Sequence, residues 1–160
     1  MNAPDLLPEA AIPAGFRPVR IAGQFVAHNG PLFARIEGDH RVQLGFRVEL
    51  RHTNSMGVCH GGMLATFADM LVPCAAMYRP GLERRFLPTI SLQVDYMGAA
   101  KVGDWVQGEG EILRSTRNML FGQALVTSNG EPALRVSGVF KQGPLIDGAQ
   151  AVDPLGLFDR

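Results

Sequence analysis

Residues 52–69 read His-Thr-Asn-Ser-Met-Gly-Val-Cys-His-Gly-Gly-Met-Leu-Ala-Thr-Phe-Ala-Asp, and this stretch decides how the chain is interpreted. A polar, turn-prone loop leads into a His-Gly-Gly helix start, and one carboxylate, Asp69, interrupts the apolar helix that follows. Backbone N–H groups at a helix start can stabilise a developing oxyanion. A carboxylate inside an apolar helix is costly unless it has a partner or a function. Together the two features indicate carbonyl chemistry.

The segment from Gly61 to about Tyr78 is predicted to be a helix. One apolar face repeats at helical intervals, through Leu64, Phe67, Ala68, Leu71 and Ala75. Asp69 lies off this stripe, on a face of small residues that a ligand could approach closely. Pro73 removes a backbone donor and crowds the carbonyl of Asp69, which predicts a local kink at the acid.

Strands are predicted on both sides of this helix, at residues 31–37, 41–50, 89–97, 104–115, 118–128 and 132–141. Asn129-Gly130 is the strongest hairpin signal in the chain. One long helix followed by four strands in series indicates an α+β fold, with a mostly antiparallel sheet that wraps round or covers the helix. Residues 1–30 are predicted to form an N-terminal arm, 31–141 the folded domain, and 142–160 a loose C-terminal tail.

Size and composition limit the classes of function. The 160 residues fit one domain, and a formal net charge of zero argues against a nucleic-acid partner. Two cysteines, Cys59 and Cys74, form neither a disulfide framework nor a zinc-binding spacing, so no metal is expected. The N-terminus lacks the basic and apolar regions of a signal peptide, and the longest apolar run is too short for a bilayer span. We therefore expect a cytoplasmic protein with no membrane partner.

The helix geometry separates the two halves of the motif. Asp69 lies eight residues beyond Gly61, roughly 12 Å along one helix. A reacting carbon needs both the oxyanion donor and the acid within about 3 Å. Two copies that cross about a two-fold axis could supply both, with Gly61 from one chain and Asp69 from the other. The sequence thus predicts a composite site at a homodimer interface.

Five further residues each have a functional and a structural interpretation. His60 could donate to a substrate or fix the loop, and Asn54 could hold a carbonyl or a water, or form an Asx-turn. Thr89 opens a strand that could pass the site, although threonine is also common in strands. The remaining two, Arg114 and Arg117, could contact phosphates or form a solvated face.

The pattern from the loop to the acid resembles hotdog-fold acyl-CoA thioesterases of the phenylacetate-pathway type, in the 4-hydroxybenzoyl-CoA thioesterase superfamily. It is carried by Asn54-x2-Gly57-x2-His60-Gly61-Gly62 followed by Asp69, and the similarity extends over residues 31–141, including residues 88–92, 96–97 and 101–104. The resemblance implies an antiparallel sheet wrapped round a central helix. It also implies dimers that pair their sheets, often assembled into a tetramer of two dimers.

The resemblance further implies hydrolysis of an acyl-CoA thioester, commonly arylacetyl, aryl or medium-chain acyl, to free acid and coenzyme A. Coenzyme A is then part of the substrate, and no cofactor is needed. Asp69 takes the position of the catalytic acid, which either attacks the thioester or activates water. The Gly61 amide matches the group that polarises the carbonyl, and Asn54 and His60 line that corner. The implied substrate-binding residues are Gly62, Thr89 near the water, and Arg114 and Arg117 at the coenzyme A nucleotide.

Two other functions are compatible with this pattern. A hotdog enoyl-CoA hydratase typically pairs an acid with a histidine on or near the helix, yet every histidine here lies at or before residue 60. A non-catalytic acyl-CoA-binding or sensing protein would keep the pocket, and the retained Asp69 disfavours it. The release of free thiol from acyl-CoA substrates discriminates between the three.

Overall fold

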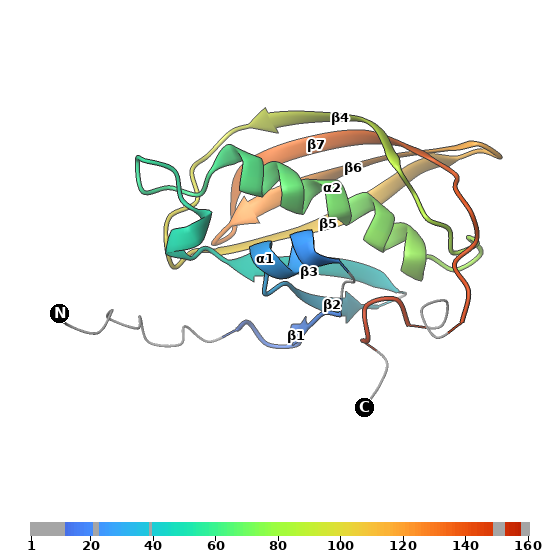
Figure 1. Cartoon of the computed structure of the whole chain (residues 1–160), viewed down its shortest axis with the longest axis horizontal. Helices are drawn as coiled ribbons and strands as arrows, with labels where there is room; N and C mark the ends of the chain where they lie inside the picture. Colours follow the sequence, from blue (N-terminus) through green and yellow to red (C-terminus); the bar gives the residue numbers. More distant parts are fainter. Residues whose placement is uncertain (1–11, 21–22, 39, 149–152, 158–160) are drawn as a thin grey trace.

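The computed structural model describes residues 12–20, 23–38, 40–148 and 153–157 of the chain. Its elements are β1 (Arg17–Pro18), α1 (Gln24–Asn29), β2 (Phe33–Glu37), β3 (Arg41–Arg47), a 3-10 turn (Leu50–His52), α2 (Gly61–Tyr78), β4 (Thr89–Tyr96), β5 (Trp105–Ser115), β6 (Met119–Ser128) and β7 (Glu131–Lys141). The strands form one antiparallel sheet in the order β1-β2-β3-β5-β6-β7-β4. This sheet curves round α2 (Figure 1), so the predicted α+β architecture is confirmed.

The helix α2 packs tightly against the middle of the sheet. Its predicted apolar stripe is buried throughout. A Cβ added at Gly110 of β5 would lie 2.3 Å from the Leu71 carbonyl oxygen, and one at Gly122 of β6 would lie 2.4 Å from a Val72 methyl carbon. The two glycines therefore let the helix approach the sheet closely, and this approach sets how far Asp69 lies from the sheet. By length and composition α2 could cross a membrane, but half of it is buried inside the protein, as in a core helix.

The hairpin between β6 and β7 forms where the sequence predicts it. Asn129 and Gly130 have φ angles of 48° and 90°. Positive φ at both central residues is the geometry of a type I′ turn, whose twist matches that of the flanking strands. This turn sets the register between β6 and β7.

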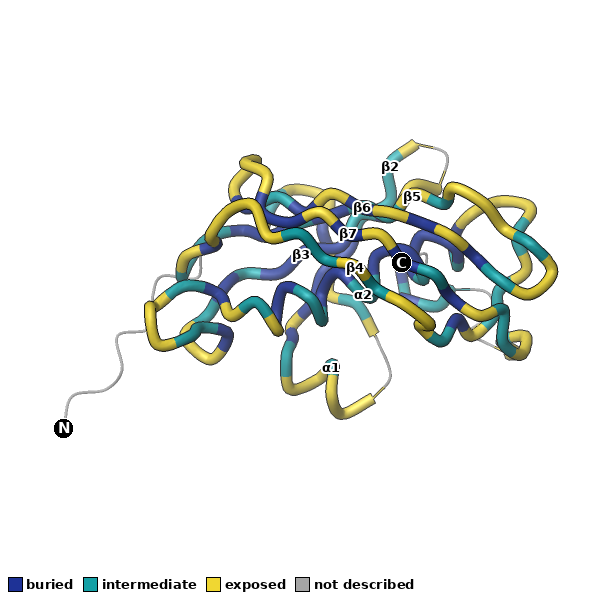
Figure 2. The backbone as a smooth tube through the Cα atoms, turned by 90° about the horizontal axis from the view of Figure 1, so that it is seen from above, coloured by how far each residue is buried: buried dark blue, intermediate teal, exposed yellow. Residues whose placement is uncertain are grey.

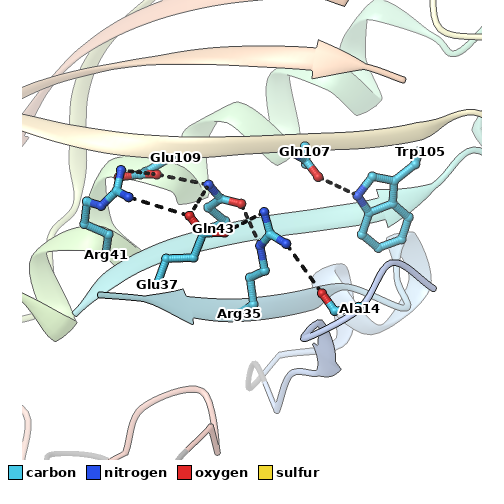
Figure 3. Close-up of polar contacts among 8 residues, drawn as sticks. All are labelled: Ala14, Arg35, Glu37, Arg41, Gln43, Trp105, Gln107 and Glu109. Atoms are coloured by element: carbon cyan, nitrogen blue, oxygen red, sulfur yellow. Dashed lines mark hydrogen bonds and ion pairs between the residues drawn. The ribbon is translucent and has the colours of Figure 1, made fainter. Parts of the chain in front are cut away.

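Polar side chains cover the outer face of β2, β3 and β5 (Figure 3). Glu37 accepts a salt bridge of 2.7 Å from Arg35, and Glu109 lies 3.3 Å from Arg41. Gln43 donates to Glu109 at 3.2 Å and accepts from Arg35 at 2.9 Å. These carboxylates are neutralised by arginines, so this face stabilises the sheet and offers no acid for chemistry.

The two terminal segments are more ordered than the sequence predicts. The predicted arm contains β1 and α1, and the chain after β7 returns to the fold. The Gly143 N–H donates to the Phe86 carbonyl at 2.9 Å, and the Phe86 N–H donates to the Pro144 carbonyl at 2.9 Å. Leu155 and Leu157 are 3% and 8% exposed. The prediction of a loose tail is therefore wrong for the described residues, because their burial depends on contacts distant in sequence rather than on a local pattern.

Candidate active site

The side chains of Asp69 and Thr89 meet where the middle of α2 passes the start of β4. Thr89, the first residue of β4, donates its hydroxyl to a carboxylate oxygen of Asp69 at 2.7 Å. The two residues lie twenty positions apart and were predicted separately; the fold brings them together. The helix runs unbroken through Pro73 to Tyr78. Because proline has no N–H, the Asp69 carbonyl lacks its usual helical donor.

A hollow of about 540 Å³ opens beside this pair. Its polar lining residues are Asp69, Thr89 and Arg20, and the rest of its wall is apolar: Val26, Met70, Pro73, Cys74, Met77, Phe86, Leu87, Pro88, Ile146, Pro154 and Leu155. A volume of about 300–1,000 Å³ with an apolar lining and few polar groups is typical of small-molecule sites. The acid therefore faces a space fitted for an apolar group.

The helix start forms a different kind of site at Gly61. His60 caps α2, since its Nδ1 accepts the Gly62 N–H at 2.8 Å, which leaves the proton of the neutral ring on Nε2. Within the part of the chain that the structure describes, the Gly61 N–H donates to no protein acceptor. The Tyr96 hydroxyl donates to the Gly61 carbonyl at 2.8 Å. Gly61 thus carries the free amide donor of this corner, while the Gly62 amide is already engaged.

The loop before α2 is held by its own polar groups. The side-chain oxygen of Asn54 accepts from the N–H groups of Met56 and Val58 at 2.9 and 3.4 Å. Asn54 therefore forms the Asx-turn that was one of its two interpretations. The His60 N–H donates to the His52 carbonyl at 2.7 Å. This loop fixes the direction in which the helix start points.

The two thiols lack the properties of nucleophiles. Burial raises the pKa of Cys59 to about 11 and that of Cys74 to about 12, so thiolate is scarce at neutral pH. Burial also lowers the pKa of His52, whose Nδ1 accepts the Glu49 N–H at 3.0 Å. No cluster of three or more His, Cys, Asp and Glu side chains suited to a metal occurs among the described residues.

The two arginines predicted at the nucleotide lie near the far end of β5. Arg117 lines a second hollow of about 280 Å³ together with Arg85. This hollow adjoins the one beside Asp69, because Met77 and Leu87 line both. Arg114 is exposed on β5. Contact of either arginine with coenzyme A remains a prediction.

The free amide lies at the start of α2 and the acid at its middle, beside opposite ends of β4. The α2 helix and β4 run antiparallel, so Asp69 pairs with the start of β4 and Gly61 with its last residue, Tyr96. The separation of eight residues along one continuous helix corresponds to about 12 Å. In addition, β4 is an edge strand of the sheet (Figure 1), and Figure 2 shows it largely accessible from above. Each chain thus presents the Asp69 carboxylate and the free Gly61 amide along one open edge.

A family model described as the thioesterase superfamily matches residues 56–133, from the loop before α2 into β7. The matched region is just under half of the chain, and it supports a hotdog-fold thioesterase. The putative esterase PA0474 of Pseudomonas aeruginosa is 29% identical to this thioesterase over 129 residues, 81% of this chain and 96% of the relative. Mouse acyl-coenzyme A thioesterase 13 is 28% identical over 96 residues, 58% of this chain and 64% of the relative.

Solved structures support the same assignment. The crystal structure of zebrafish thioesterase superfamily member 2 superposes on this thioesterase with a TM-score of 0.62 at 27% identity, covering 70% of this chain and 81% of the other. The predictions of a hotdog fold, of this superfamily and of a thioester hydrolase are therefore confirmed.

Sequence reasoning missed two parts of the site. Tyr96 was noted as a strand residue and as part of the family resemblance, and nothing in its local sequence indicates the bond to Gly61. The walls contributed by Val26 and Leu155 were also missed. The alternation of Leu155 with Leu157 is the one local signal that could have indicated a buried segment.

Proposed function

We propose that this thioesterase hydrolyses an acyl-CoA thioester to a free acid and coenzyme A, at a site shared by two chains. The observation that carries the proposal is the Asp69–Thr89 pair, which opens on an apolar hollow at one end of an exposed edge strand, with the free Gly61 amide at the other end. The names of the relatives above agree with this substrate class.

The edge strand supplies the geometry of the dimer. An exposed edge is a template for pairing with another strand, and β4 leaves Ile90 and Tyr96 53% and 54% exposed. Antiparallel pairing of β4 with its copy about a two-fold axis near Leu92 and Gln93 sets the start of one strand against the end of the other. Asp69 of one chain then lies beside Gly61 of the partner, and the same contact repeats once by symmetry.

The reaction follows from what each half-site can do. The Thr89 hydroxyl holds one carboxylate oxygen of Asp69, which leaves the other to accept a proton from water as general base. The water oxygen attacks the thioester carbon, and the Gly61 N–H of the second chain donates to the developing oxyanion. Collapse of the tetrahedral intermediate breaks the C–S bond, and the proton on Asp69 passes to the departing thiolate of coenzyme A.

The remaining predicted residues act in support. His60 and Asn54 hold the helix start in place through the contacts described above. Gly62 lets the substrate pass close to the helix. Arg114 and Arg117 contact the phosphates of coenzyme A, for which guanidinium groups are well suited.

A thiol-release assay tests the proposal directly. Purified protein is incubated with arylacetyl-, aryl- and medium-chain acyl-CoA substrates, and free coenzyme A is measured with a thiol reagent. We expect release by the wild-type protein and very little by Asp69→Asn. Release from none of the substrates would overturn the proposal and favour an acyl-CoA-binding protein.

A further inference from the structure

We propose that the terminal segments of this chain form the closed end of the acyl pocket and set the longest acyl chain that it accepts. The terminal wall is defined as Arg20, Val26, Ile146, Pro154 and Leu155. The inference rests on the proposed acyl-CoA thioesterase function and extends it to the substrate class, an acyl chain of medium length.

Part of the lining of the hollow beside Asp69 comes from the terminal segments. Five of its fourteen lining residues belong to the terminal wall. All five lie outside residues 56–133, the region that matches the superfamily. The acid and its hydroxyl partner come from the matched region, whereas about a third of the lining residues come from outside it.

The second observation is that the C-terminal segment is fastened to the end of α2. The Tyr78 hydroxyl donates to an Asp153 carboxylate oxygen at 2.7 Å and accepts the Leu155 N–H at 2.8 Å. The same Asp153 oxygen accepts the Leu157 N–H at 2.8 Å. The Arg20 N–H donates to the Leu155 carbonyl at 3.2 Å, which joins the two terminal segments. The wall is thus a fixed part of the fold.

The loop after α2 secures the rest of the wall. Residues 142–146 run beside 84–88, and the Ile146 N–H donates to the Arg84 carbonyl at 2.9 Å. Arg84 in turn donates to the Met77 carbonyl at 2.7 Å, near the end of α2. Ile146 therefore has a defined position relative to the helix that carries Asp69.

The position of the terminal wall determines the length of acyl chain that the hollow can hold. Asp69 and Tyr78 are nine residues apart, about 13 Å along α2. A thioester carbonyl held at Asp69 directs its acyl chain along this apolar path toward Leu155. Met70 and Met77 line the path with flexible side chains that adapt to an alkyl chain. Leu155, only 3% exposed, blocks further extension.

A chain-length series tests this inference. Values of kcat/KM are measured for saturated acyl-CoA substrates of increasing length with the wild type, Leu155→Ala and Leu155→Trp. We expect the optimum to move to longer chains in Leu155→Ala and to shorter chains in Leu155→Trp. Each methylene newly accommodated should raise kcat/KM by about fourfold, which corresponds to ~0.8 kcal/mol.

The matched control is Leu157→Ala. Leu157 is 8% exposed and sits in the same core cluster, but it does not line the hollow. Its truncation should lower stability while the chain-length optimum stays in place. An equal shift in both alanine variants, or no shift in Leu155→Ala, would overturn the role of the wall.

A binding measurement separates this inference from the proposed function. Non-hydrolysable acyl-CoA thioether analogues of the same lengths are titrated by calorimetry, and the Kd series should show the same shift. Suppose that no thioester is hydrolysed, but that the chain length of tightest binding changes in the Leu155 variants. The proposed activity is then wrong, and the role of the terminal wall is confirmed. If Leu155→Ala does not fold, Tyr78→Phe loosens the same segment, and a broadened preference for longer chains is expected; an unchanged preference would contradict the wall.

Discussion

In the proposed reaction, the groups beside the two ends of β4 differ in chemical kind. At the Asp69 end, a side-chain carboxylate is positioned by the Thr89 hydroxyl and opens on an apolar hollow. At the Gly61 end, the useful group is a backbone N–H, fixed by the His60 cap. A base must exchange a proton and is therefore a titratable side chain, whereas an oxyanion donor works best when rigid. The proposed reaction needs both groups, and a second chain would bring them together.

Removing the base should give the largest effect. Asp69→Asn keeps an oxygen for the Thr89 hydroxyl but removes the proton acceptor, so kcat should fall by about 10²- to 10⁴-fold. KM and the melting temperature should stay near their wild-type values, because the contact is retained. Turnover unchanged from wild type would exclude Asp69 as the base.

Removing the donor at the other end should cost slightly less. Gly61→Pro deletes the N–H, and kcat should fall by about 10²- to 10³-fold, as for a lost oxyanion donor. The fold should tolerate this change, because His60 has φ −62° and ψ 136°, the extended geometry that a residue before proline adopts.

Gly61→Ala is the control for the loss of the donor. It keeps the N–H, although its Cβ would lie 3.3 Å from the Tyr96 ring. If kcat falls equally in both variants, the loss comes from contact of the new side chain with Tyr96 rather than from the missing N–H. Such a result would contradict the role of the Gly61 amide as oxyanion donor.

Removing the hydrogen bond that positions Asp69 should lower kcat moderately. Thr89→Val removes the hydroxyl that donates to Asp69 at 2.7 Å, and kcat should fall about tenfold, or ~1.4 kcal/mol, near the lower limit for a hydrogen bond to a charged group. Thr89→Ser restores the hydroxyl and should restore most of the rate. Equal kcat for the valine and serine variants would remove Thr89 from the site.

Acid should destabilise the fold through His52, whose carbonyl accepts the His60 N–H beside Gly61. Burial lowers the pKa of His52 below its ordinary value of 6.5, so the unfolded chain binds this proton more readily than the folded one. The stability that neutral His52 contributes is therefore present above pH 6.5 and is lost as the pH falls toward its folded pKa. Melting temperatures measured between pH 8 and 5 should show this loss, and His52→Asn, which keeps an acceptor for the Glu49 N–H, should flatten that part of the curve. A curve of unchanged slope in the variant would assign the pH dependence to other groups.

The local parts of this molecule could be predicted from the sequence. Periodic apolar residues located α2 and the main strands, and Asn129-Gly130 located the hairpin. The half-sites at Gly61 and Asp69 could be proposed because each lies within one continuous motif. The rise of a helix then predicts that the two groups serve different reacting carbons within one chain.

The parts that escaped prediction depend on contacts between distant segments. Thr89 reaches Asp69 across twenty residues, and Leu155 reaches Tyr78 across 77. A short segment such as 153–157 buries its leucines because the end of α2 supplies both an apolar surface and a hydroxyl. No periodicity in so short a segment encodes that surface, so only the folded structure reveals the wall.

The most direct test of the central claim is the activity of a mixed dimer, prepared by co-expressing Gly61→Pro and Asp69→Asn chains with different affinity tags. If each site combines Gly61 of one chain with Asp69 of the other, the mixed dimer holds one intact site and one doubly defective site. We predict about half the wild-type kcat per dimer, while each parent homodimer stays nearly inactive. A mixed dimer as inactive as its parents would contradict the shared site and place both groups of each site within a single chain.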